Sequence, residues 1–193
     1  MDVPLTFSVQ IGGHTLELPV VPLSNAPVSI ALFDSLGDLA LCDFLAERMI
    51  AVTRDRGIEL EHIDVILTAG KAVTLAESTA RRLGMLEIAV AERQAKSFWP
   101  ESFGAVSRSI TGGKQERLVV GGRRAKLLAG KRILIIDDVI STGESIRALT
   151  RIARHYGEPS LIMAPFFEGD HSGVKLIEGI PAVVLKSLPV WPR

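Results

Sequence analysis

Residues 131–145 read KRILIIDDVISTGES, and this stretch decides which fold the chain can adopt. Four consecutive apolar residues, 133–136, precede two adjacent aspartates, Asp137 and Asp138. A short run of this kind is typical of a strand buried on both faces of a parallel sheet. We therefore expect the two carboxylates at the carboxyl end of a central strand, which is where such sheets bind their ligands.

A loop of small and hydroxyl-bearing residues, 141–145, follows the aspartates and leads into a helical pattern. Gly143 permits a tight turn, and the free N–H groups and positive dipole of a helix start favour a phosphate. Carboxylates repel a phosphate, so their place beside such a site makes sense if they hold sugar hydroxyls, carry a metal ion or stabilise positive charge on a sugar. The residue types also leave open a simple capped helix start.

Strand and helix patterns alternate through residues 63–167. The predicted strands are 63–70, 86–93, 132–137, 160–167 and 181–190, and the predicted helices are 36–54, 72–84 and 143–157. Alternation of this kind, with strands that are apolar on both faces, predicts an α/β fold whose parallel sheet has helices on both faces.

Two segments differ from this pattern. Residues 5–21 alternate apolar and polar side chains around Gly12 and Gly13, which predicts a β-hairpin. Residues 97–122 contain two strand-like pieces on either side of a Thr-Gly-Gly turn, 111–113. We interpret this second segment as a long, mobile hairpin that projects from the core.

The composition excludes several classes of protein. The chain has 22 basic and 22 acidic residues and a formal net charge of zero, so a general nucleic-acid or membrane surface is not indicated. Its single cysteine, Cys42, rules out an intrachain disulfide. No apolar run reaches the roughly 20 residues that span a bilayer, and the first ten residues lack a signal-peptide pattern. We expect a cytoplasmic protein without nucleic-acid or membrane partners.

The segment 133–145, ILIIDDVISTGES, closely resembles the phosphoribosyl-pyrophosphate signature of type I phosphoribosyltransferases. That signature is an apolar strand, two acids, two apolar residues and a short Ser/Thr/Gly loop. Within the superfamily, residues 36–49 (LGDLALCDFLAERM), 63–84 (IDVILTAGKAVTLAESTARRLG) and 127–143 (LLAGKRILIIDDVISTG) are most similar to adenine phosphoribosyltransferases and their relatives.

The resemblance covers about residues 28–190 and implies the type I phosphoribosyltransferase fold. That fold is a parallel, Rossmann-like sheet with helices on both faces, a small hood and a flexible hairpin loop. One domain would span residues 1–193. Its parts would be a hood hairpin at 1–30, a core at 31–167 with the flexible loop at 97–122, and a C-terminal strand and tail at 168–193 that add to the hood.

The resemblance also assigns roles by position. Asp137 and Asp138 would contact the ribose hydroxyls and hold Mg²⁺ through water, and Lys71 and Arg93 would complete the catalytic group. Phe167 and Glu168 would line the base pocket. The residues expected to bind phosphoribosyl pyrophosphate are Ala69, Gly70, Lys71, Arg93, Lys96, Asp137, Asp138, Ser141, Thr142, Gly143, Glu144 and Ser145.

The reaction implied by the resemblance attaches a nucleobase to C1 of phosphoribosyl pyrophosphate and releases pyrophosphate. The expected acceptor is a purine such as adenine, the cofactor is Mg²⁺, and the expected assembly is a homodimer. Adenine-specific members usually carry Arg-Gly where this chain has Gly70-Lys71-Ala72, which keeps a xanthine- or pyrimidine-type transferase open. A regulatory protein that binds phosphoribosyl pyrophosphate without transferring it is the other alternative.

Overall fold

The computed structural model describes residues 3–24, 26–108, 115–172 and 175–193. At its centre lies a sheet with the strand order β11-β12-β10-β8-β4-β5, and β9 also pairs with β10. The neighbours pair in parallel except β11 and β12, which are antiparallel. The strands are β4 (Val65–Ala69), β5 (Ile88–Ala91), β8 (Arg132–Ile136), β9 (Val139–Ile140), β10 (Glu158–Glu168), β11 (Leu176–Ile177) and β12 (Ile180–Leu188). The predicted parallel sheet is confirmed.

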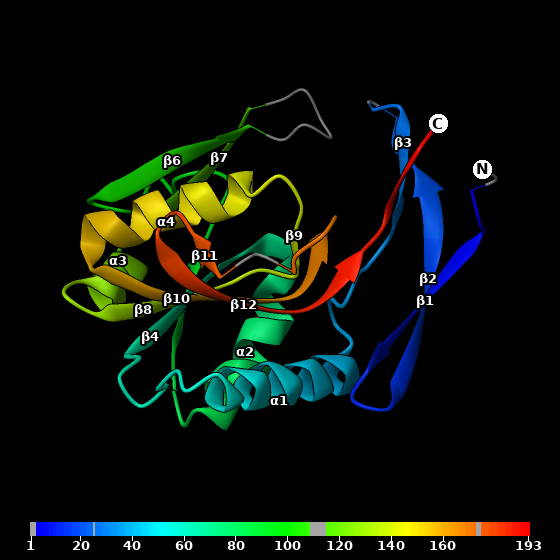
Figure 1. The fold of residues 1–193 in the computed structure, drawn as a ribbon. Coiled ribbons are helices and arrows are strands. Elements are labelled where there is room, and N and C mark those ends of the chain that lie inside the picture. The colour runs from blue at the N-terminus through cyan, green and yellow to red at the C-terminus, as the bar shows by residue number, and fades with distance from the viewer. Residues whose placement is uncertain (1–2, 25, 109–114, 173–174) are drawn as a thin grey trace.

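Helices cover both faces of this sheet, as predicted (Figure 1). The helices α1 (Leu39–Asp55) and α2 (Val73–Arg82) lie on one face, and α3 (Arg123–Leu128) and α4 (Glu144–Tyr156) lie on the other. Side chains of β8 alternate between these layers: Leu134 and Ile136 pack with α1 and α2, whereas the preceding Ile133 and Ile135 pack with α4.

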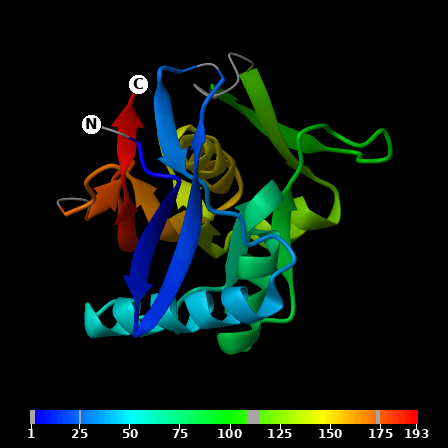
Figure 2. The same cartoon turned by 90° about the vertical axis from the view of Figure 1, so that its right-hand side faces the viewer.

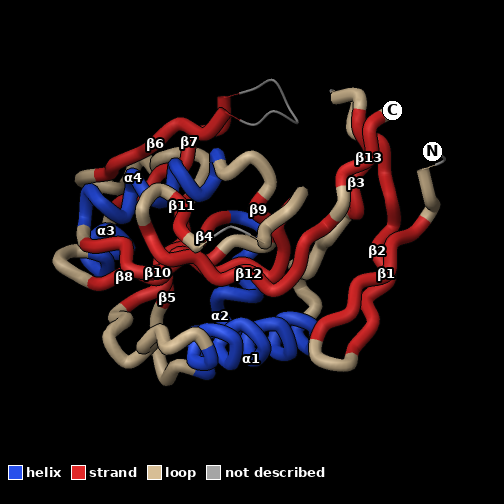
Figure 3. The backbone as a smooth tube through the Cα atoms, in the orientation of Figure 1, coloured by secondary structure: helices blue, strands red, loops and turns tan. Residues whose placement is uncertain are grey.

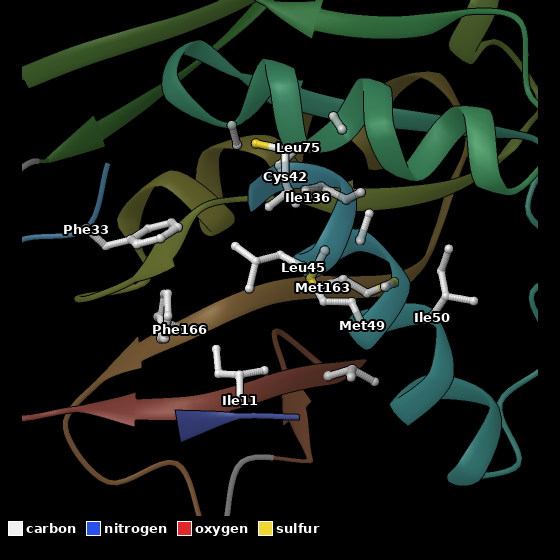
Figure 4. Packing of buried hydrophobic residues seen from close by; sticks show 14 of the residues in the cluster. Ile11, Phe33, Cys42, Leu45, Met49, Ile50, Leu75, Ile136, Met163 and Phe166 are labelled. Carbon is white, nitrogen blue, oxygen red and sulfur yellow. The ribbon is translucent and has the colours of Figure 1, made fainter. Parts of the chain in front are cut away.

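Burial of β8 explains why its sequence has no polar position before the aspartates. Residues 133–136 are completely buried, and full burial of one such side chain contributes about 1.5–3 kcal/mol. Figure 4 shows Ile136 in the same buried cluster as Leu45, Met49 and Met163, which come from α1 and β10. The strand that carries Asp137 is therefore fixed on both faces by the core.

A second, antiparallel sheet forms the hood at the carboxyl ends of the central strands (Figure 2). It contains β1 (Thr6–Ile11), β2 (His14–Pro22), β3 (Val28–Ala31) and β13 (Val190–Pro192), in that order. The predicted hairpin supplies β1 and β2, with both glycines of its turn at positive φ. Phe33, which follows β3, meets Phe166 of β10 edge to face with ring centroids 4.6 Å apart.

The predicted hairpin at 97–122 forms β6 (Ser102–Arg108) and β7 (Gln115–Gly121), which pair antiparallel. Its described part packs on α4 and joins the core, so it projects less than we expected, and its mobility stays a prediction. Phe103 stacks on His155 with centroids 3.9 Å apart, and Tyr156 donates its hydroxyl hydrogen to the carbonyl of Val120 at 3.1 Å. The turn at 111–113 lies outside the described residues.

Helix α1 begins at Leu39, three residues later than predicted. Asp38 adopts an extended backbone conformation, and its carboxylate accepts the N–H of Leu41 at 3.0 Å. This N-cap satisfies one of the free donors of the first turn and sets the start of the helix. None of the helices in the described ranges is long and apolar enough to cross a bilayer.

Candidate active site

The two aspartates directly follow β8, and the hood lies beyond the carboxyl ends of the central strands (Figure 3). Asp137 accepts the N–H of Asp138 at 3.0 Å, and Asp138 accepts the N–H of Val139 at 2.9 Å. Both side chains are partly buried. Burial raises the pKa of Asp137 well above its ordinary value, the neighbouring carboxylate of Asp138 raises it further, and the charge of Lys71 opposes the rise. Such a pair stabilises a cation or sugar hydroxyl donors.

The loop between the aspartates and α4 has the geometry of an anion site. After β9 the chain turns through Ser141 and Thr142 to Gly143, which is the N-cap of α4 and has a left-handed φ of 76°. Glycine has no side chain to cap the helix, so it leaves the N–H groups of the first turn available to a ligand. These donors and the helix dipole favour a phosphate at this position.

Glu168, which we expected in a base pocket, contacts this loop. It is the last residue of β10, and its carboxylate accepts the hydroxyl hydrogen of Ser141 at 2.5 Å. Phe167 is half-buried and packs against the core on the α4 side, and its neighbour Phe166 is completely buried. The structure therefore brings Glu168 next to the predicted phosphate site, and it makes Phe166 a core residue.

The segment after β4 lies at the same edge of the sheet as the aspartates. Thr68 donates its hydroxyl hydrogen to the carbonyl of Ile136 at 2.9 Å, which ties the ends of β4 and β8 together. A single turn of 3₁₀ helix, η1 (Gly70–Ala72), follows and turns into α2. Lys71 is exposed on this turn, and its charge acts on the pKa of Asp137. The predicted pyrophosphate segment and the acids therefore share one site.

Arg93 and Lys96 follow β5, the edge strand, which is two strands away from β8. The Lys96 ammonium lies 2.5 Å from a carboxylate oxygen of Glu92, and Arg124 of α3 pairs with the other oxygen. The bonds from Lys96 and Arg124 hold the pKa of Glu92 below its ordinary value. In this conformation Lys96 therefore belongs to an ion-pair cluster at the sheet edge and is not directed at Asp137 or Asp138.

The Lys96 cluster borders a pocket of about 450 Å³ at this sheet edge. Trp99 closes one side of it and lies against Gly121 and Gly122, where a Cβ atom would come within 2.5 and 3.0 Å of the indole. The glycines are thus required for the close approach of the indole ring. The Arg93 side chain is exposed on the segment that leads into this region.

Sequence reasoning missed two contacts that shape the hood side of the site. The Nδ1 atom of His171 lies 2.5 Å from the hydroxyl oxygen of Ser187, which joins the segment after β10 to the end of β12. Phe33 covers Phe166 at the junction between hood and core. Only the position of His171 after a predicted strand gave a signal, because Phe33 and Ser187 stand in segments without a recognisable motif.

The residues present fit a magnesium ion that is shared with a substrate. Within the described ranges, no three His, Cys, Asp or Glu side chains group to form a metal site. Mg²⁺ usually keeps several waters and binds through one or two carboxylates together with substrate phosphates, so it does not need such a cage. Asp137 and Asp138 supply carboxylates of this kind beside the predicted phosphate site.

Comparisons with solved structures show that adenine phosphoribosyltransferases have the same fold as this chain. An adenine phosphoribosyltransferase from Rhodothermus marinus superposes with a TM-score of 0.67 at 16% identity, over 88% of this chain and 93% of that one. The enzyme from Thermoanaerobacter pseudethanolicus gives 0.62 at 18% identity, over 78% and 82% of the two chains. The Saccharomyces cerevisiae enzyme, bound to an imino-altritol bisphosphate and adenine, gives 0.58 at 19% identity, over 76% and 80%.

No curated protein sequence matches the chain. Residues 43–190 match the phosphoribosyl transferase domain, and this match includes β4, β8, the loop before α4 and the end of β10. It therefore covers most of the chain, including both aspartates and the proposed phosphate loop. This chain belongs to the phosphoribosyl transferase domain family and has the type I fold of the adenine phosphoribosyltransferases.

Proposed function

We propose that this protein transfers the 5-phosphoribosyl group of phosphoribosyl pyrophosphate to a nucleobase and releases pyrophosphate. The observation that carries the proposal is the arrangement at the end of β8. Two partly buried carboxylates, Asp137 and Asp138, directly precede a loop whose left-handed Gly143 starts a helix. The carboxylates can accept hydrogen bonds from sugar hydroxyls, and the N–H donors of the loop can bind a phosphate. The arrangement therefore suits a phosphorylated ribose.

The roles of the chain's residues follow from the charge that develops in the reaction. The glycosidic transition state resembles an oxocarbenium ion, with positive charge on the ribose and negative charge on the leaving pyrophosphate. Asp137 and Asp138 would hold the ribose hydroxyls, and the N–H groups of loop 141–145 would hold the 5′-phosphate. Lys71 would stabilise the departing pyrophosphate. Catalysis would then consist of positioning and electrostatic stabilisation.

Arg93 and Lys96 are proposed to act on the pyrophosphate only after a rearrangement. Lys96 is held by Glu92, so a contact with substrate requires exchange of a carboxylate for a pyrophosphate oxygen. An exposed ion pair is worth about 0–1 kcal/mol, so a doubly charged phosphate competes for the ammonium easily.

Magnesium, when bound, would supply positive charge that neutralises part of the negative charge of the pyrophosphate. Asp137 and Asp138 are the residues that would hold it, through water. The chain's own contribution is to keep both carboxylates oriented by the N–H groups of the two following residues, Asp138 and Val139.

The proposed acceptor is a purine such as adenine. Support comes from the Saccharomyces cerevisiae enzyme of the same fold, whose structure contains adenine. In this chain, the hood and the end of β10, with Phe167 and Glu168, border the proposed ribose site and are where we expect the base. The homodimer, the cytoplasmic location and the absence of nucleic-acid and membrane partners stay predictions.

Ligand-induced thermal stabilisation tests the proposal. Phosphoribosyl pyrophosphate at 100 times its Kd should add about 2.7 kcal/mol to the free energy of unfolding, provided that Mg²⁺ is present. No shift in Tm at millimolar ligand would contradict the proposed site. Binding without base-dependent release of pyrophosphate would instead identify a regulatory protein.

A further inference from the structure

The proposed phosphate loop contains a carboxylate, that of Glu144, whose negative charge repels a phosphate. Glu144 is the first residue of α4 and stands directly after Gly143, where the 5′-phosphate is expected. Its side chain is 28% exposed, so solvent screens it only in part. A carboxylate next to a phosphate dianion repels it unless a cation compensates the charge.

Arg147 supplies that cation from the next turn of the same helix. Its guanidinium pairs with the carboxylate of Glu144, and its Nε lies 3.3 Å from a carboxylate oxygen of Glu178. A Cβ atom at Gly143 would lie only 3.8 Å from Nη2 of Arg147. The cation therefore lies between the turn that begins the helix and an acid from a different part of the chain.

Glu178 is held in place for this contact. It lies in the turn between β11 and β12 and has a φ of 53°, the sole positive φ among the non-glycine residues that the structure describes. Arg154 donates to its carbonyl at 2.6 Å and lies 4.0 Å from its carboxylate. A left-handed conformation costs a non-glycine residue about 1–3 kcal/mol and persists only where its surroundings fix it. Arg154 and Arg147 provide that fixation.

We propose that Arg147 is a positioning residue for the 5′-phosphate, which deepens the proposed function and rests on it. Arg147 neutralises Glu144 and draws its carboxylate toward Glu178, so the N–H groups at the start of α4 face the phosphate without a competing negative charge. The four side chains together, Glu144, Arg147, Arg154 and Glu178, are neutral. Removing one cation leaves a net negative charge beside the phosphate.

The test measures Kd for two probes, ribose 5-phosphate and magnesium pyrophosphate. Only the first carries the phosphate expected at this loop. Arg147→Met should weaken ribose 5-phosphate binding about tenfold, or roughly 1.4 kcal/mol, and leave pyrophosphate binding unchanged. Arg151→Met is the matched control, because Arg151 is exposed on the same helix and carries the same charge; it should change neither Kd.

The double variant separates neutralisation from direct contact with the phosphate. If Arg147 acts by compensating Glu144, then Arg147→Met/Glu144→Gln should bind ribose 5-phosphate within about threefold of wild type. The defect of Arg147→Met should also shrink in 1 M salt, where the Debye length is about 3 Å. A double variant as weak as Arg147→Met would overturn the proposal.

Glu144→Gln gives a reading that does not depend on how well Arg147→Met folds. It removes the repulsive charge and keeps the cation, so ribose 5-phosphate should bind several-fold more tightly than to wild type. Equal or weaker binding would contradict the inference. Wild-type protein that binds neither probe would overturn the proposed function as well, whereas wild-type binding with equal effects of Arg147→Met and Arg151→Met would overturn this inference alone.

Discussion

Ser141 donates its hydroxyl hydrogen to the carboxylate of Glu168 at 2.5 Å. This bond joins the proposed phosphate loop to the end of β10, next to the region where the base is expected. A serine hydroxyl has one hydrogen to donate, so it cannot serve Glu168 and a phosphate at the same time. Binding of phosphoribosyl pyrophosphate should therefore release Glu168 toward the region where the nucleobase is expected.

Ser141→Ala tests this link between the two sides of the site. Loss of one hydrogen-bond donor to a doubly charged phosphate should weaken binding of phosphoribosyl pyrophosphate about 10- to 160-fold, since a hydrogen bond to a charged group contributes about 1.5–3 kcal/mol. Ser160→Ala is the control, because that hydroxyl bonds to a carbonyl near the opposite end of β10. Equal Kd values for both variants and wild type would show that Ser141 does not meet the phosphate.

Replacing both acids of the site, in Asp137→Asn/Asp138→Asn, should lower turnover by at least about 10²–10³-fold. The chain should still fold with an undiminished Tm, because asparagine removes a charge whose burial is unfavourable at Asp137. Asp64→Asn is a matched control: this acid accepts the N–H of Arg132 at 2.8 Å, at the other end of β8. Retained transfer in the double variant would refute the assignment of the acids.

Gly143→Ala and Gly130→Ala separate a local requirement of the phosphate loop from general backbone strain. Both glycines have positive φ, 76° and 67°, and neither position would crowd an added Cβ atom closer than 3.8 Å. Each variant should lose about 1–2 kcal/mol of stability. Only Gly143→Ala should also weaken the binding of phosphoribosyl pyrophosphate, and titration calorimetry can measure this change in Kd. Unchanged affinity would contradict the role of the left-handed N-cap.

The ion pairs of Glu92 predict a pH-dependent contribution to stability. Its pKa is lowered in the folded state by Lys96 and Arg124, so the folded protein binds fewer protons than the unfolded chain in the window around the ordinary pKa. This stability is present above that pKa, about 4.3, and is lost as the pH falls through the folded value. Glu92→Gln should therefore cost about 1 kcal/mol at pH 7 and much less at pH 3.

Urea unfolding of wild type and Glu92→Gln at several pH values measures this difference. Glu47→Gln is the control, because its carboxylate is 65% exposed and its contact with Arg82 spans 3.5 Å. A difference between wild type and Glu92→Gln that stays constant from pH 7 to pH 3 would show that the ion pairs are not its source.

The sequence predicted the features that a short segment determines by itself. An apolar run cannot be solvated, so β8 had to be buried, and the aspartates had to emerge at its end. Gly143 likewise indicated the turn before α4, because glycine readily adopts the left-handed conformation that this turn has. For these reasons the positions of the two acids and of the loop before α4 could be predicted from residues 131–145 alone.

Contacts between distant segments could not be predicted in the same way. Strand β13 pairs with β3 although more than half of the chain separates them in sequence, and no local pattern encodes such a partner. Arg124 of α3 pairs with Glu92, which lies 32 positions earlier in the chain, and no local pattern encodes this contact either. The contact between Ser141 and Glu168 depends on how β9 aligns with β10.

The most direct test of the proposed function is pyrophosphate release from phosphoribosyl pyrophosphate and Mg²⁺ with adenine, guanine, hypoxanthine, xanthine, uracil or orotate as acceptor. The Asp137→Asn/Asp138→Asn protein serves as the blank. We predict release that requires a base, is fastest with a purine such as adenine, and is absent from the blank. Release that is no faster with any base than without one, or equal release by the blank, would contradict the assignment of this chain as a transferase.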